Sequence, residues 1–165
     1  MKQKVLYLGM GLFTFVTLIL GGLWLEHRAY RRVPSHPVVS RSAEEDRVAE
    51  ALFRHLLQEH QGLRVYFLSR DGADPSDDFM RRFQGERPLV KKNSLSVRGK
   101  YRSILDKESG AIAGIVSVGA VKWISDSEVE VGGAFYDGEV IEYRYRMART
   151  NIGWIVSGKE FVVES

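Results

Sequence analysis

Residues 71–78, DGADPSDD, form the stretch richest in side-chain oxygens and invite comparison with a calcium-binding loop. An EF-hand loop needs oxygen ligands at positions 1, 3 and 5 and a glutamate at position 12. Counted from Asp71, the chain has Ala73 at position 3, Pro75 at position 5 and Arg82 at position 12. The pattern does not match, so we predict no metal site and interpret the acids as helix caps.

Catalytic groups are scarce along the chain. His55 and His60 are five residues apart, which places them on different faces of a helix and prevents a shared metal. There is no cysteine, which excludes thiolate catalysis, thiolate metal sites and disulfides. In an enzyme, Asp71, Asp74 or Tyr66 would have to act as the acid or base, from a loop folded over a cavity. We therefore predict no catalytic residue and no cofactor.

Binding residues are easier to propose. One locally basic run contains a single acid, Glu86, and suits lipid head groups, a phosphorylated ligand or an acidic partner. The alternative is a solvated segment whose charge is balanced by the acids before it. The cations of this run are Arg81, Arg82, Arg87, Lys91, Lys92, Arg98, Lys100 and Arg102.

Aromatic residues of the C-terminal half are candidate ligand or partner contacts. They alternate with polar residues, so ordinary core and cross-strand packing is the competing interpretation. The candidates are Trp123, Tyr136, Tyr143, Tyr145 and Trp154.

One long amphipathic helix is expected to begin the folded part of the chain. Ser42 and Glu45 have the spacing of a capping box, and Gly62 is placed to end the helix as its C′ residue. A second, short helix is expected over residues 75–83, capped by Asp74 or Ser76. The apolar stripe of the long helix is Val48, Ala49, Leu52, Phe53, Leu56 and Leu57.

Strands dominate the remainder. The alternation of apolar and polar residues predicts strands over residues 63–69, 112–124, 128–136, 140–147 and 152–163, the last with a break at Gly158. A two-residue turn at 137–138 would place Tyr145 opposite Glu130, an apolar residue against a charge. An odd-numbered loop, or a bulge at 132–133, avoids this mismatch. Without a bulge, two glutamates of one strand face two arginines of the next.

The segment Val5 to Leu25 contains 21 residues and no charge or proline. As a helix it would extend about 31 Å, which matches the hydrocarbon core of a bilayer. A cleaved signal peptide would have a shorter apolar run and small residues after it, whereas Glu26, His27 and Arg28 follow here. We therefore predict an uncleaved single-pass anchor, with a cleaved signal and then a buried core helix as the alternatives.

The charge distribution supports this division of the chain. Residues 1–32 carry five Lys or Arg and one Glu, whereas residues 33–165 carry 19 Lys or Arg and 20 Asp or Glu. The basic pI therefore belongs to the flanks of the span and does not indicate nucleic-acid binding. We predict an anchor over 1–32, a linker over 33–42 and one α+β domain over 43–165. We expect the protein to be located in the bacterial inner membrane, with the domain on the extracytoplasmic side.

The order of elements, ending in Gly153-Trp154-Ile155-Val156, resembles the cystatin-like and NTF2-like α+β folds. Residues 66–83 and 122–138 also look like stretches of small bacterial proteins of unknown function. The resemblance implies a curved antiparallel meander wrapped around one long and one short helix. NTF2-like enzymes use an Asp, Glu or His inside the cavity, and this chain offers none at a matching position.

Two functions follow as hypotheses. The first is a membrane-anchored, non-enzymatic binding or assembly module of the bacterial envelope, with another envelope protein or a homodimer through the sheet as its partner. The second is a cavity enzyme, an isomerase or hydrolase acting on a small apolar substrate.

Overall fold

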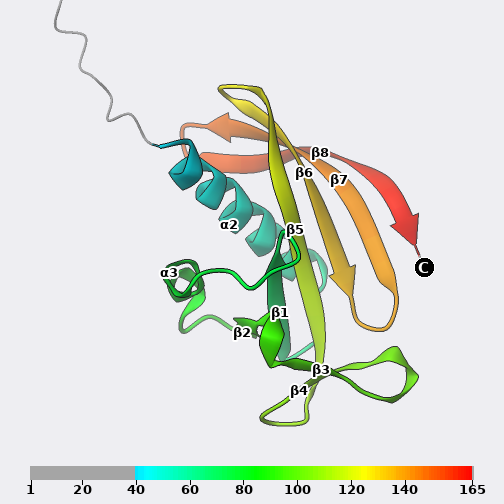
Figure 1. The fold of residues 1–165 in the computed structure, drawn as a ribbon. Helices are drawn as coiled ribbons and strands as arrows, with labels where there is room; N and C mark the ends of the chain where they lie inside the picture. Colours follow the sequence, from blue (N-terminus) through cyan, green and yellow to red (C-terminus); the bar gives the residue numbers. More distant parts are fainter. Residues whose placement is uncertain (1–39, 165) are drawn as a thin grey trace, which may run out of the picture. The chain divides into compact units, whose positions relative to one another are not determined.

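The computed structural model describes residues 40–164, which form an α+β domain (Figure 1). The predicted span, Val5 to Leu25, lies outside these residues. Within 40–164 no helix is both long and apolar enough to cross a bilayer. The compact unit begins at Ser40, so residues 40–42, predicted as linker, belong to the domain.

The long helix, α2 (Arg41–Glu59), packs its apolar stripe onto one face of the sheet. All six residues of the predicted stripe are buried. The predicted cap is two residues too late, because the Ser40 hydroxyl accepts the hydrogen bond from the Ala43 amide. At the other end His60 is the C-cap, so Gly62, predicted as C′, lies one residue beyond the C′ position.

The sheet is mixed, which corrects the predicted antiparallel meander. Its main order is β2 (Leu89–Lys92), β1 (Val65–Arg70), β5 (Ile112–Ser125), β6 (Glu128–Tyr136), β7 (Val140–Thr150) and β8 (Gly153–Glu164). β5 to β8 do form an antiparallel meander, whereas β1 is parallel to both β2 and β5. β3 (Ser96–Arg98) and β4 (Ile104–Asp106) form a hairpin whose second strand pairs with the start of β5.

The chain between β1 and β2 contains the predicted short helix. It divides into α3 (Asp77–Met80) and the 3-10 turn η1 (Arg81–Phe83). Ser76 is the cap, since its hydroxyl accepts from the Phe79 amide at 3.2 Å, while Asp74 binds the Ser94 amide instead. The rings of Phe79 and Phe83 both pack edge-on against Phe53 of α2. Two further 3-10 turns are η2 (Asn93–Leu95) and η3 (Lys100–Arg102).

The predicted register of β6 and β7 is confirmed. The connection is the three-residue loop Asp137-Gly138-Glu139, and Val131 lies opposite Tyr145 with no bulge. The glutamates and arginines consequently share the face away from α2, where Arg144 is 3.7 Å from Glu130 and Arg146 is 3.3 Å from Glu128. The irregularity predicted near Gly158 is also present, as a register shift between Val156 and Gly158.

Candidate functional site

The predicted contact aromatics mostly join the sheet to α2. The Trp154 indole donates to Glu44 and the Trp123 indole donates to Glu45, each at 3.0 Å. The two indoles pack edge to face, with ring centroids 5.7 Å apart. Trp154 is buried and Trp123 half-buried, so these side chains stabilise the seam at the start of α2.

Tyr145 is fully buried, and its hydroxyl donates to Glu59 at the end of α2. Burial raises the pKa of Tyr145, and the charge of Glu59 acts in the same direction, so the phenol stays a hydrogen-bond donor at neutral pH. Tyr143 is half-buried between the rings of Tyr145 and Phe161. Tyr136 does not contact α2 through a hydrogen bond; its hydroxyl donates to the Arg102 carbonyl at 3.0 Å.

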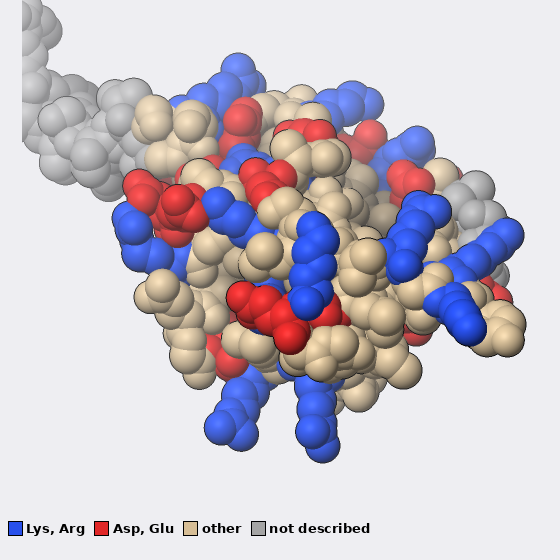
Figure 2. Space-filling view, turned by 60° about the horizontal axis from the view of Figure 1, so that its bottom comes forward, with Lys and Arg blue, Asp and Glu red and all other residues tan. Residues whose placement is uncertain are grey.

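The basic run does not form one surface. Acidic and basic side chains are interspersed over the face in Figure 2, and the cations of the run divide into four groups. Arg81 and Arg82 belong to the α3–η1 segment, and Arg87 lies beside a groove. Lys91 pairs with Asp106 and Lys92 with Asp77. Arg98, Lys100 and Arg102 lie together on the β3–β4 hairpin.

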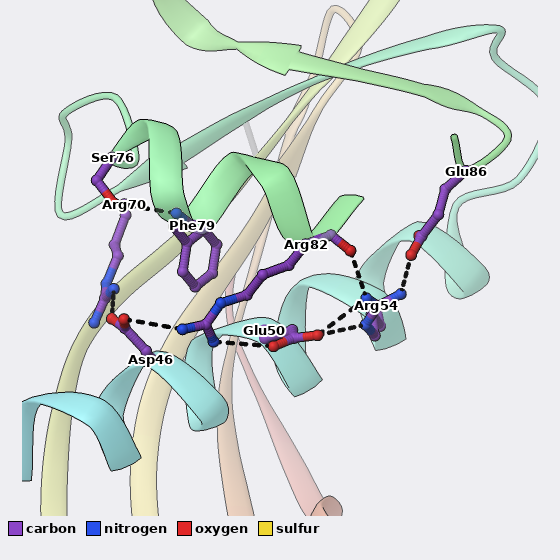
Figure 3. Close-up of polar contacts among 8 residues, drawn as sticks. All are labelled: Asp46, Glu50, Arg54, Arg70, Ser76, Phe79, Arg82 and Glu86. Carbon is purple, nitrogen blue, oxygen red and sulfur yellow. Dashed lines mark hydrogen bonds and ion pairs between the residues drawn. The ribbon is translucent and has the colours of Figure 1, made fainter. Parts of the chain in front are cut away.

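Arg82 belongs to a network of alternating charges that fastens α3 and η1 to α2 (Figure 3). Its guanidinium donates to Glu50 at 3.0 Å and to Asp46 at 3.3 Å. Asp46 also accepts from Arg70 of β1, while Glu50 accepts from Arg54. The guanidinium groups of Arg70 and Arg82 both lie over the Phe79 ring. These cations already have partners within the domain.

A groove of about 950 Å³ lies between the C-terminal half of α2, the turn before β1 and the chain leading into β2. Its volume is within the range of small-molecule sites. Three arginines and one glutamate line it, and the glutamate, Glu86, is paired with Arg54. The apolar part of the lining is Leu57, Leu63, Tyr66, Pro88, Leu89 and Val90.

Arg64 and Arg87 are the two remaining arginines of the groove. Neither forms an ion pair with another residue of the described domain. They lie at the same end of the sheet, because β1 and β2 are parallel and the Leu89 amide donates to the Arg64 carbonyl at 3.0 Å. The groove therefore combines an apolar floor with two positive charges at one end.

The acid and base groups proposed for an enzyme do not converge here. Asp71 and Asp74 are exposed in the turn after β1 and do not line the groove. Tyr66 does line it, but its hydroxyl donates to the His60 carbonyl and accepts from the Leu63 amide at 3.2 Å. Within residues 40–164 no three His, Asp or Glu side chains lie close enough together to hold a metal ion.

Sequence reasoning misses two residues of interest. Arg64 stands alone in the sequence and reaches the groove only through the pairing of β1 with β2. Tyr101 could have been found, since an aromatic residue between cations and after a glycine is typical of an exposed turn. No family model, curated protein or solved structure matches the chain.

Proposed function

We propose that this protein is a non-enzymatic binding module of the bacterial envelope, held at the inner membrane by Val5 to Leu25, with its domain on the extracytoplasmic side. The observation that carries the proposal is the groove beside β2, whose single carboxylate is paired and whose two free arginines flank an apolar floor. Such a surface can bind an amphiphile and offers no free carboxylate as a base. The proposal includes the NTF2-like fold inferred from the sequence, which is compatible with a binding module.

The ligand that fits this chemistry is a single-chain anionic lipid. Arg64 and Arg87 would hold its carboxylate or phosphate, and the chain would lie along Leu57, Leu63 and Val90. A hydrogen bond to a charged group contributes about 1.5–3 kcal/mol, so removal of both guanidinium groups should lower affinity at least about tenfold. A bilayer supplies such lipids next to an anchored domain.

Photolabelling of the full-length protein tests this proposal. The protein is reconstituted in phosphatidylcholine nanodiscs and irradiated with a photoactivatable palmitate. Labelled peptides are expected to contain residues 57–66 or 87–90, and labelling is expected to fall at least tenfold when Arg64 and Arg87 are both changed to Ala. Lys122→Ala, a cation of the far face of the sheet, is the matched control and should label normally.

Competition separates the role of charge from simple hydrophobic partitioning. Unlabelled palmitate should displace the probe, whereas hexadecanol, which has the same chain without a charge, should not. Equal displacement by the two, or unchanged labelling of the double variant, would show that the groove is not an anion site.

The cavity enzyme remains the alternative proposal and is less well supported. Of its three suggested catalytic groups only Tyr66 lines the groove, and both hydrogen bonds of that hydroxyl are made to the backbone.

A further inference from the structure

The hairpin formed by β3 and β4 carries three cations and one exposed aromatic residue at its turn. We call Arg98, Lys100, Tyr101 and Arg102 the basic tip. Tyr101 is 97% exposed, more than any other large hydrophobic residue of the described domain. None of the ion pairs among residues 40–164 includes Arg98, Lys100 or Arg102. A side chain this exposed buries almost no apolar area in the folded domain, so its ring is free to contact a partner.

The backbone of the basic tip is well defined. Tyr101 and Arg102 are both left-handed, with φ of 56° and 63°, a conformation that non-glycine residues adopt at a cost. Hydrogen bonds close the turn around them, from the Gly99 amide to the Ser103 carbonyl at 2.8 Å and from the Ser103 hydroxyl to the Lys100 carbonyl at 2.7 Å. The turn therefore holds the backbone of Tyr101 in one conformation.

Contacts below the turn fix its position on the domain. Tyr136 of β6 donates to the Arg102 carbonyl, and the Arg98 guanidinium lies over the Tyr136 ring at 6.0 Å. At Gly99 an added Cβ would lie 2.6 Å from the Ser103 hydroxyl and 2.9 Å from a Leu105 methyl, so these two side chains would have to move to admit it. Tyr136, a predicted contact residue, thus supports the site from behind.

The identity of the partner follows from the chemistry of the tip. Tyrosine and arginine are among the residues enriched in protein–protein hot spots, and three cations without an ion pair are complementary to an acidic surface. Residues 33–165 have a net charge of −1, and three cations are few for nucleic acid.

We propose that the basic tip docks on an acidic pocket of a partner protein, with the Tyr101 ring inserted and the flanking cations on carboxylates at its rim. This interaction is independent of the groove, which lies beside β2 and shares no residue with the tip. It gives the domain a second binding surface, one that recognises protein and not lipid.

Site-specific photo-crosslinking in the full-length protein tests the proposal in native membranes. Benzoylphenylalanine replaces Tyr101, and in a matched control it replaces Ile152, which is 85% exposed on the turn between β7 and β8. We expect a discrete protein adduct at position 101 and not at 152, and the crosslinked partner peptide should be rich in Asp and Glu. Lys100→Glu combined with Arg102→Glu should reduce the adduct at least tenfold, while Lys122→Glu should not.

The free energy of unfolding shows whether a variant binds weakly because it has lost the docking contact or because it no longer folds. Tyr101→Gly removes the ring and suits the left-handed backbone, so the variant should fold as well as the parent and bind the identified partner at least tenfold more weakly. A crosslink to lipid or nucleic acid, a partner peptide without acidic residues, an adduct that survives charge reversal, or no adduct would each overturn the proposal.

Discussion

Lys91 and Asp106 form the most buried ion pair of residues 40–164, with side-chain exposures of 14% and 1%. Asp106 accepts from Ser109 at 2.6 Å and from Lys91 at 2.9 Å, and Lys91 also binds Glu108. The Ser109 hydroxyl, followed by the Lys91 ammonium, lowers the pKa of Asp106 from 3.8 to about 2. The ionised form of Asp106 is therefore the one that stabilises the contact between β2 and the β4–β5 turn.

This pair predicts an acid-sensitive stability. Because the pKa of Asp106 is lower in the folded state, the ionised carboxylate stabilises the domain above about pH 4, and that contribution is lost as pH falls towards about 2. Asp106→Asn should destabilise a fragment of residues 40–165 by about 2–4 kcal/mol at pH 7, because it leaves the Lys91 charge with fewer partners.

Urea unfolding at several pH values measures this effect. The variant should also lose less stability than the parent between pH 4 and pH 2. Asp126→Asn, in the exposed turn between β5 and β6, should match the parent throughout. A variant with the parent's unfolding free energy at pH 7 would show that the pair is not stabilising.

At the scale of the element, α2 illustrates how a cap is chosen. Ser40 and Ser42 both precede helical residues with a carboxylate three or four positions on, and either could have capped the helix. In the folded domain Glu44 and Glu45 accept hydrogen bonds from the two indoles and not from the amide of a capping residue. The helix begins two residues earlier than the capping box implies, with Ser40 at the N-cap.

The two serines provide a matched pair for measurement. Ser40→Ala should cost about 1 kcal/mol of unfolding free energy, since the Ala43 amide loses its side-chain acceptor, whereas Ser42→Ala should change it by less than about 0.5 kcal/mol. Both are measured by urea unfolding of the same fragment. A larger effect at Ser42 would restore the capping box as the true start of the helix.

At the scale of the whole molecule, the domain has three features of note: the charged network that fastens α3 to α2, the groove beside β2, which shares Arg54 and Glu86 with that network, and the basic tip. They depend on long-range pairing of β1 with β2 and β5, and of β4 with β5. The proposed function adds an anchor, which concentrates the groove and the tip at a membrane surface.

The anchor itself is tested by extraction. The full-length protein should stay in the membrane pellet after carbonate washing at its full length, because an apolar segment of 21 residues is retained by the bilayer. Val16→Arg combined with Leu18→Arg should release it, since each central arginine costs about 2.5–3.5 kcal/mol on insertion. Leu25→Arg should leave the protein in the membrane, because an arginine at the end of the span can reach the head groups. A shortened parent protein in the soluble fraction would overturn the anchor.

Local pattern in the sequence was sufficient for much of the fold. The buried stripe of α2 and the alternation along β6 and β7 were predictable, because each depends on residues close together in the sequence. For the short helix the sequence left Asp74 or Ser76 as the cap, and for the β6–β7 register an odd-numbered loop or a bulge at 132–133; the structure has Ser76 and the three-residue loop at 137–139.

Only the tertiary structure decided the rest. The parallel insertion of β1 between β2 and β5 joins residues nearly fifty positions apart, and no periodicity encodes such a pairing. That pairing places Arg64 beside Arg87, while the fold turns Tyr145 and Trp154 inwards and leaves Tyr101 in water. The residue types were visible in the sequence, but burial and the presence of a charged neighbour are properties of the folded chain, and these determine which side chains remain free to bind.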